Sequence, residues 1–420
     1  MRSTVCARCR PLFGSARRQI LRSATRQQRR NESTDTASSY AINNEQEVTK
    51  RKDKIVFSGI QPTGIPHLGN YLGALRQWKE MQDDLEASGS NDKLLFSVVD
   101  LHALTMPQDA PALLLRRREM IAALLAIGLD PKKGSTIFLQ SSVPQHTELM
   151  WILSCTASMG YLSRMTQWKS KVSMQHKTTD IGELARDKLK LGLFSYPVLQ
   201  AADILVHRAT HVPVGDDQQQ HIEFARECVK NFNYAFEKDV LIRPEIVTAP
   251  SPRIMSLSDP ESKMSKSAPN HKSRILITSR PSDVRSRLKS AVTDSLGTVN
   301  WDPQNRPGVT NLLEIMAQCQ PPSPEGKRPT TREMSKNMFG ATLKELKDDV
   351  AAAVCAELDG IRDRYDDFLH RKGGKWIDEI EAEGAEVARR NAAETMSLVR
   401  EAVGFGTRPD YISPGPVDEM

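Results

Sequence analysis

IVFSGIQPTGIPHLGNYLGAL, residues 55–75, predicts a strand, a turn and the first part of a helix in immediate succession. Residues 55–60 form an apolar run suited to a buried strand, and residues 61–66 hold the two prolines and the glycine typical of a turn. Four apolar side chains then recur near one face of the predicted helix: Leu68, Leu72, Leu75 and Met81. His67 is therefore expected at a helix N-terminus, where the helix dipole and unpaired N–H groups favour phosphate.

The alternation of strand and helix continues after this unit. Apolar runs predict further strands at residues 94–99 and 136–139, and amphipathic patterns predict helices at 110–127 and 147–158. Such alternation predicts an α/β fold with a doubly wound parallel sheet and helices on both faces. Ligands of these sheets bind beyond the carboxyl ends of the strands, where His67 is expected to lie.

Helical patterns dominate the sequence beyond about residue 275. One apolar stripe is predicted to run along a helix that ends at Gly373-Gly374: Val350, Val354, Leu358, Ile361, Tyr365 and Phe368. A second helix is expected from about Trp376 to Val403, and the proline-rich residues 321–329 are expected to form an exposed loop. The doubly wound sheet is therefore predicted to be followed by an all-helical C-terminal domain.

A second short motif, Lys263-Met264-Ser265-Lys266-Ser267, brings two ammonium groups three positions apart. A loop of this kind can follow a leaving pyrophosphate, while the imidazole of His67 can donate to phosphate oxygens as charge develops. Gly69 has no side chain and lets a planar base approach the backbone. Either motif taken singly occurs by chance, and a structural role is then the better interpretation.

Taken together and in this order, His67-Leu68-Gly69-Asn70 and residues 263–267 resemble the two nucleotide-binding signatures of class I aminoacyl-tRNA synthetases. The surrounding residues, Gly69-Asn70-Tyr71-Leu72-Gly73-Ala74 among them, are similar to tryptophanyl-tRNA synthetases of the bacterial and mitochondrial type. The resemblance implies a Rossmann-like catalytic domain at residues 54–272 and a helical anticodon-binding domain at 273–410. It also implies ATP with Mg²⁺, L-tryptophan and tRNA(Trp) as ligands, and a homodimer.

The same resemblance implies roles for individual residues. The catalytic residues would be His67, Asn70, Lys263 and Lys266, with asparagine where many class I enzymes have a second histidine. The implied ATP contacts are Gln61, Pro62, Thr63, Gly69, Asn70, Gly215, Asp216, Asp217, Ile254, Lys263, Met264, Ser265, Lys266 and Ser267. The implied tryptophan contacts are Asp203, Tyr196 and Gln218.

Residues 196–205, YPVLQAADIL, are the candidate specificity segment. On a helix, Tyr196, Gln200 and Asp203 share one face, and a carboxylate in an aromatic pocket can accept the indole N–H. Residue chemistry alone favours a plainer interpretation, in which Asp203 is a helix carboxylate paired with Arg208. The resemblance assigns indole binding to Asp203.

Residues 212–218, VPVGDDQ, are expected to begin a helix with dipole-matched acids. In the family this segment contacts the ATP ribose and the substrate ammonium and usually reads Gly-Glu-Asp-Gln, whereas Asp216 replaces the glutamate here. Asp217 and His221 have metal-ligand spacing but no third ligand nearby, so no metal site is predicted. Asp100, His102 and residues 164–171 also match the family, and His102 and His221 are expected to be hydrogen-bonded structural histidines.

The first thirty residues contain nine arginines and neither lysine nor acidic residues. This composition is typical of a mitochondrial transit peptide, and a basic RNA-binding arm is the alternative. Residues 1–50 are thus predicted to be a transit peptide and a disordered connector, and the mature chain a protein of the mitochondrial matrix. Without the nine arginines the net charge of +6 falls to about −3, so polyanion binding would need local basic patches.

The six cysteines are scattered apart from Cys6 and Cys9, which argues against a zinc or redox site, and no apolar stretch is long enough to span a bilayer.

Other functions remain open from the sequence. A tyrosyl-tRNA synthetase shares both ATP motifs, and a small-molecule nucleotidyltransferase could share the turn before His67. A non-enzymatic RNA-binding protein derived from a synthetase is a further alternative, although such a protein would tolerate the loss of His67 or Lys263. Both residues are present.

Overall fold

The computed structural model describes residues 53–169, 189–248, 253–266 and 268–406. The chain divides into two units, residues 1–51 and 52–420, and every described residue belongs to the second unit. The predicted transit peptide and connector therefore lie outside the described residues.

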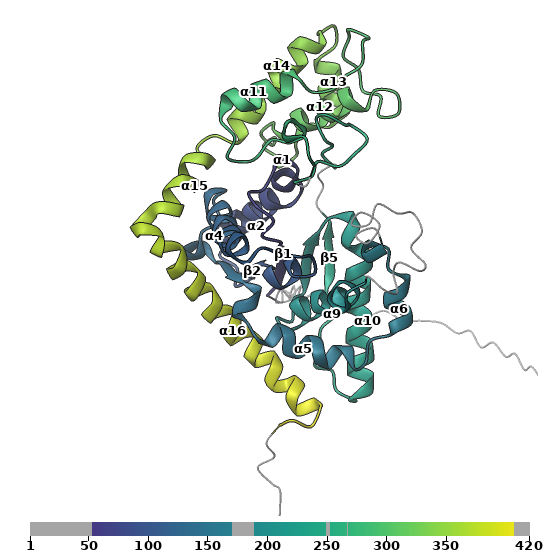
Figure 1. Ribbon diagram of the computed structural model, residues 1–420, viewed down its shortest axis with the longest axis vertical. Helices are drawn as coiled ribbons and strands as arrows, with labels where there is room; N and C mark the ends of the chain where they lie inside the picture. The colour runs from purple at the N-terminus through teal and green to yellow at the C-terminus, as the bar shows by residue number, and fades with distance from the viewer. Residues whose placement is uncertain (1–52, 170–188, 249–252, 267, 407–420) are drawn as a thin grey trace, which may run out of the picture. The chain divides into compact units, whose positions relative to one another are not determined.

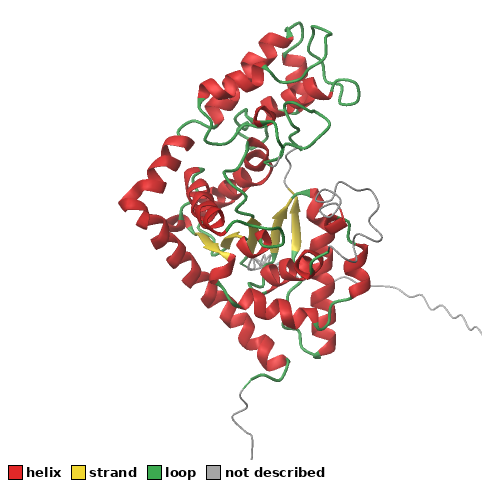
Figure 2. Cartoon of the chain, in the orientation of Figure 1, coloured by secondary structure: helices red, strands yellow, loops and turns green. Residues whose placement is uncertain are grey.

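A five-stranded parallel sheet lies within residues 55–248, and helices cover both of its faces (Figure 1, Figure 2). The strand order is β3-β2-β1-β4-β5, and all four pairings are parallel. The strands are β1 Ile55–Ile60, β2 Lys93–Val98, β3 Ser135–Leu139, β4 His211–Val214 and β5 Glu245–Thr248. The prediction of a doubly wound α/β fold is confirmed, because the strand order reverses direction between β1 and β4.

The helices that surround the sheet largely match the predicted ranges. They are α1 Leu68–Asn70, the π-helical turn Tyr71–Leu75, α2 Arg76–Ser88, α3 Asp100–Ala103, α4 Ala110–Ala126, α5 Gln145–Ser154, α6 Met159–Arg164, α9 Leu191–Leu205 and α10 Gln219–Ala235. The helix predicted to run to residue 158 ends at Ser154, and α6 follows as a separate helix because Ser158 caps its N-terminus.

The first predicted helix is interrupted by the π-helical turn but still buries its apolar face. Leu68, Leu72 and Leu75 are buried, and Met81 packs partly buried against the same core. Next along this face, Trp78 stacks on Phe96 of β2 with ring centroids 4.6 Å apart. This packing fixes the helix on the sheet and so fixes the position of its first residues.

Among the described residues of the C-terminal part, beyond residue 273, the regular elements are all helices, joined by loops. Its helices are α11 Pro281–Lys289, α12 Pro307–Gln318, α13 Thr331–Asn337, α14 Leu343–Glu357, α15 Ile361–His370 and α16 Lys375–Ala402. The prediction of one helix across Val350 to Phe368 is wrong, because Gly360 has a φ of +68° and separates α14 from α15. The stripe is still buried over most of its length, because its spacing continues across the break.

The last helix, α16, returns to the sheet and packs along β3 (Figure 1). A Cβ atom added at Gly384 would lie 1.8 Å from the carbonyl oxygen of Ile137, so only glycine permits this approach. The boundary between the two domains near residue 272 stays a prediction. No helix among the described residues is long and apolar enough to cross a membrane.

Candidate active site

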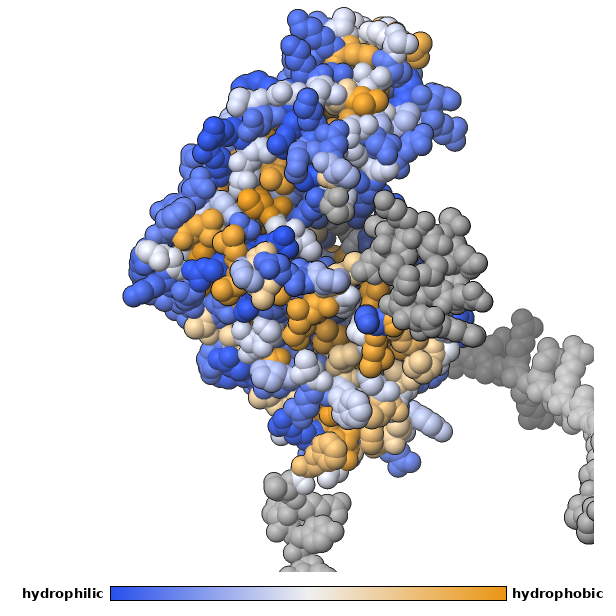
Figure 3. All heavy atoms as spheres, viewed as in Figure 1, coloured by the Kyte–Doolittle hydropathy of each residue, from blue (hydrophilic) through white to orange (hydrophobic). Residues whose placement is uncertain are grey.

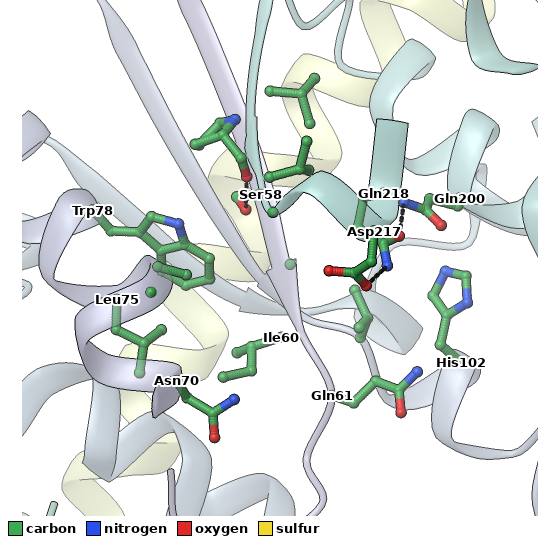
Figure 4. Close-up of a pocket in the computed structure, with 18 of the residues that line it drawn as sticks. Ser58, Ile60, Gln61, Asn70, Leu75, Trp78, His102, Gln200, Asp217 and Gln218 are labelled. Carbon is green, nitrogen blue, oxygen red and sulfur yellow. Dashed lines mark hydrogen bonds between the residues drawn. The ribbon is translucent and has the colours of Figure 1, made fainter. Parts of the chain in front are cut away.

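A cavity of about 840 Å³ opens at the carboxyl ends of β1, β2 and β4, the place where such sheets bind ligands (Figure 4). Twelve of the predicted site residues line it: Gln61, His67, Gly69, Asn70, Tyr196, Asp203, Gly215, Asp217, Gln218, Ile254, Lys263 and Met264. Segments from five separate parts of the sequence thus meet at one site.

Four predicted residues whose side chains are described do not line the cavity: Pro62, Thr63, Ser265 and Lys266. Pro62 and Thr63 lie in the turn after β1, and Asp216 begins the 3₁₀ turn Asp216–Gln218 before α10. Ser267 lies outside the described residues. Lys266 instead donates from Nζ to the carbonyl oxygen of Gly64 at 2.6 Å, so it reaches the turn that precedes His67.

His67 caps the helix that it precedes. Its Nδ1 accepts the backbone N–H of Asn70 at 3.2 Å, and the Oδ1 of Asn70 accepts the backbone N–H of His67 at 3.2 Å. A neutral imidazole that accepts at Nδ1 carries its proton on Nε2. His67 is therefore oriented as an Nε2–H donor.

The imidazole of His67 is kept neutral by its surroundings. Burial first, and then the positive charges of Lys266 and Lys263, lower its pKa from 6.5 to about 3. A neutral His67 donates to a phosphate oxygen without needing protonation near pH 7.

Gly69 lies close to His67 and Ile254. A Cβ atom at its position would be 3.2 Å from the His67 ring and 3.5 Å from Cβ of Ile254.

Backbone hydrogen bonds join the segment that carries the two lysines to the first motif. Leu68 N–H donates to the carbonyl of Ile275 at 2.8 Å, and Ile277 N–H donates to the carbonyl of Pro66 at 3.0 Å. Near the cavity, Lys263 Nζ lies 3.9 Å from Asp217 Oδ1, and both side chains are about half exposed. Such an exposed pair is weak, which leaves the Lys263 ammonium able to exchange Asp217 for a phosphate.

Asp203 on α9 is buried, with only 1% of its surface exposed, and three side chains donate to it. His146 Nδ1 and Gln140 Nε2 donate to Oδ1 at 2.6 and 2.7 Å, and His102 Nε2 donates to Oδ2 at 2.8 Å. The alternative in which Asp203 pairs with Arg208 is therefore wrong.

These donors keep Asp203 ionised. Burial alone would raise its pKa, but the hydrogen bonds and charges of His102 and His146 outweigh that and hold the pKa well below its usual range. A carboxylate has about four acceptor positions, and the three protein donors leave one on Oδ2. Because Asp203 lines the cavity, that position can accept an N–H group from a ligand.

Polar side chains of α9 and of the turn before α10 form a second network at the cavity (Figure 4). Gln200 Nε2 donates to Gln218 Oε1 at 3.1 Å, and Gln218 Nε2 donates to Asp217 Oδ2 at 2.8 Å. The Tyr196 hydroxyl lies 2.9 Å from His221 Nε2 and 3.0 Å from Gln167 Oε1. This network fixes a carboxylate and an amide at the rim, where a ligand ammonium could be bound.

Several residues at the site carry functions that the sequence did not assign. Gln140 and His146 hold Asp203, yet each is an isolated polar residue whose partner is 63 or 57 positions away. His102 and His221 form buried hydrogen bonds, as expected, and His102 also lines the cavity. Asp100 accepts a hydrogen bond from the Ser141 hydroxyl at 2.6 Å and does not line the cavity.

Metal ligands do not cluster anywhere in the described part of the chain, where no group of three His, Cys, Asp or Glu residues could hold an ion. The four described cysteines are free thiols.

Comparison with known proteins identifies relatives of this chain. Residues 49–358 match the family model described as tRNA synthetases class I (W and Y). The chain is 42% identical over 355 residues to the mitochondrial tryptophan–tRNA ligase of Schizosaccharomyces pombe, covering 83% of this chain and 95% of that protein.

Two solved structures are similar over most of the chain. The tryptophanyl-tRNA synthetase from Mycoplasma pneumoniae has a TM-score of 0.71 at 30% identity and covers 84% of this chain and 99% of its own. The enzyme from Campylobacter jejuni, solved in complex with ADP and tryptophan, has a TM-score of 0.64 at 30% identity, covering 83% and 99%.

Proposed function

The chain belongs to the class I aminoacyl-tRNA synthetases of the tryptophanyl and tyrosyl type, and on this premise we infer that it ligates L-tryptophan to tRNA(Trp) with ATP. The relatives that carry this function cover most of both chains, which supports the same reaction here. We further propose that the reaction passes through a tryptophanyl-adenylate made at the cavity beyond β1, β2 and β4.

The observation that supports this chemistry most strongly is the meeting of His67 and Lys263 at one cavity, with Lys266 on the adjoining turn. Adenylate formation joins the tryptophan carboxylate to the α-phosphate of ATP and expels pyrophosphate. It needs positioning and charge neutralisation rather than a covalent nucleophile. His67 Nε2–H and the two ammonium groups supply donors and positive charge where the phosphates would lie.

Asp203 supports tryptophan as the amino acid. The acceptor position that its three protein donors leave on Oδ2 suits one N–H, and the indole ring offers one. Tyr196 adds aromatic surface beside it, and Gln218 faces the position proposed for the substrate ammonium. We assign the ATP contacts to the motif residues that line the cavity, and to Pro62, Thr63, Asp216, Ser265, Lys266 and Ser267 as neighbours of them.

Mg²⁺ is proposed to enter with ATP, because this ion keeps several waters and binds largely through substrate phosphates. Asp217 lines the cavity 3.9 Å from Lys263 Nζ, and its half-exposed carboxylate fits an ion held mainly by the nucleotide. The ion would neutralise charge on the leaving pyrophosphate.

A homodimer is proposed from the exposed apolar side chains of three helices that pack together. Trp151 on α5, Met159 on α6 and Leu191 on α9 expose 73, 67 and 77% of their surfaces. Figure 3 shows hydrophobic side chains gathered on the face where α5 and α9 lie in Figure 1. Exposed apolar surface of this kind marks association sites.

The mitochondrial matrix is the proposed location. The arginine-rich first thirty residues and the mitochondrial relative of S. pombe support it. The anticodon-binding role of the helical part, residues 273–410, is a proposal from the family.

Amino-acid-dependent exchange of pyrophosphate into ATP tests the function. Tryptophan should support exchange and tyrosine should not, and Asp203→Asn should impair the tryptophan reaction selectively by raising KM for tryptophan more than KM for ATP. Exchange with tyrosine instead would make the chain a tyrosyl enzyme. Binding of RNA with no exchange for either amino acid would support the non-enzymatic alternative.

A further inference from the structure

We propose that Asn391 on α16 positions the Asp203 carboxylate through two buried histidines, His207 and His146, and thereby sets the affinity for the amino acid. The proposal deepens the assigned function, because it rests on Asp203 being the acceptor for the indole N–H. It makes Asn391 and His207 positioning residues, since neither lines the cavity and both act through His146.

A continuous set of contacts connects α16 to the cavity. Asn391 Oδ1 lies 2.8 Å from His207 Nδ1, His207 Nε2 lies 3.2 Å from His146 Nε2, and His146 Nδ1 lies 2.6 Å from Asp203 Oδ1. Both histidine side chains are completely buried. The set therefore runs from a helix 188 positions further along the chain (391 minus 203) to a carboxylate that lines the cavity.

Asn391 and Asp203, at the two ends of this set, determine which nitrogen atoms donate in its hydrogen bonds. The amide oxygen of Asn391 can only accept, so His207 donates from Nδ1 and, being neutral, has its lone pair on Nε2. Burial and the neighbouring His146 lower the pKa of His207 to about 3, in keeping with a neutral ring. His146 must then donate from Nε2 to His207 and from Nδ1 to Asp203.

This assignment gives His146 two protons and a positive charge next to Asp203. A buried carboxylate is costly without a counter-charge, and His146 supplies one without occupying the last acceptor position on Oδ2. Asn391 selects this state, because it fixes which nitrogen of His207 carries the proton. Without that acceptor, His207 can move its proton to Nε2 and His146 no longer needs its second proton.

Packing holds the two rings in place. His207 stacks on Phe57 with centroids 5.6 Å apart and meets the edge of Phe138 at 5.5 Å. The helix that carries Asn391 is itself fixed on β3 by the close approach at Gly384. A change at Asn391 is therefore expected to act through protons and hydrogen bonds rather than through movement of the rings.

The test compares two substitutions of similar size in the full chain, Asn391→Gln and Asn391→Leu. Glutamine keeps a neutral amide oxygen that can accept from His207, and leucine removes it. Asn391→Leu should raise KM for tryptophan about tenfold in pyrophosphate exchange and leave KM for ATP unchanged. Asn391→Gln should stay within about threefold of the wild type for both substrates, on the scale of one retained hydrogen bond.

Met396→Leu is the packing control, since Met396 is buried on the same helix but is not among these hydrogen-bonded residues. It should leave both KM values unchanged. Equal effects of glutamine and leucine at position 391, or equal changes in the two KM values, would overturn the proposal in favour of a purely structural asparagine.

The ¹⁵N chemical shifts of the histidine ring nitrogens provide a measurement that does not depend on activity. His207→Phe identifies the resonances of His207. The proton should be on Nδ1 in the wild type and in Asn391→Gln, and on Nε2 in Asn391→Leu. An unchanged His207 signal in Asn391→Leu would contradict the proposal even if KM rises.

Different results would contradict the proposed function and the role of Asn391. No tryptophan-dependent exchange by the wild type would contradict the proposed function, and the ¹⁵N shifts would then decide the hydrogen-bond chain alone. An active wild type with a selective defect in Asp203→Asn, but none in Asn391→Leu, would preserve the function and overturn the role of Asn391.

Discussion

The Nζ atom of Lys266 donates a hydrogen bond of 2.6 Å to the carbonyl oxygen of Gly64, 202 residues earlier in the chain. This contact closes the lysine loop onto the turn that leads into His67. Burial lowers the pKa of Lys266 from 10.5 to about 8, which leaves the ammonium protonated at neutral pH. A neutral carbonyl is a weaker partner for it than a phosphate, so ATP can replace Gly64.

Lys266→Ala should lower the rate of tryptophan-dependent exchange by on the order of 10² while tryptophan binding stays largely intact. The lost charge is one that acts mainly on the developing pyrophosphate. Exchange kinetics and equilibrium dialysis with labelled tryptophan measure the two effects. Lys272→Ala, an exposed lysine six residues further on, is the matched control and should change neither. Equal loss of binding and rate in Lys266→Ala would mean that the loop is structural.

His67→Asn separates the two roles of that residue. Asparagine is a good N-cap, so stability should remain within about 1 kcal/mol of the wild type, whereas His67→Ala loses the cap as well. Both variants lose the Nε2–H donor, so both should reduce exchange by on the order of 10². Denaturant unfolding and exchange rates measure this. Full activity in His67→Asn would show that the imidazole serves only as a cap.

Acid should destabilise the protein through His67 and His207. Both have a pKa lowered to about 3 in the folded state, against 6.5 when unfolded, so the unfolded chain binds more protons below pH 6.5. Stability should therefore fall by on the order of 3 kcal/mol between pH 7 and pH 5.

Urea unfolding at one protein concentration measures this dependence on pH. The double variant His67→Asn, His207→Phe should show a much flatter profile over the same range. A wild-type stability that does not change between pH 7 and pH 5 would contradict burial of two neutral histidines.

Gly384→Ala should reduce the free energy of unfolding by roughly 3 kcal/mol or more, because its Cβ would lie 1.8 Å from the Ile137 carbonyl oxygen. Gly192→Ala on α9 is the control, since no atom lies within 4 Å of its added Cβ. That variant should be neutral or slightly stabilising. Similar behaviour of the two variants in thermal unfolding would contradict the packing of α16 on β3.

The parts of the fold that depend on local pattern could be predicted from the sequence. The strand, turn and helix around His67 were predictable because each has a distinct spacing of apolar residues and turn residues. The π-helical turn after Asn70 and the break at Gly360 were not. In both places the apolar residues keep a helical spacing, so the sequence pattern does not reveal the change in backbone conformation.

The site was predictable where its residues form short motifs and not where single residues meet through the fold. Gln140, His146 and His207 have no motif. Gln140 follows β3, His146 lies on α5 and His207 follows α9, so only tertiary packing brings them together near Asp203. The sequence indicates the packing of α16 on the sheet only weakly, through a glycine within a helix that is followed by alanines on one face. Its meaning depends on a strand some 250 residues earlier.

A double-mutant cycle of His67→Asn and Lys266→Ala in tryptophan-dependent pyrophosphate exchange tests the central claim most directly. If both groups act on one triphosphate, the double variant should be impaired far less than the product of the two single losses, with a coupling of about 1 kcal/mol or more. A double variant whose loss equals that product would show that the two residues act independently and would contradict a shared phosphate site.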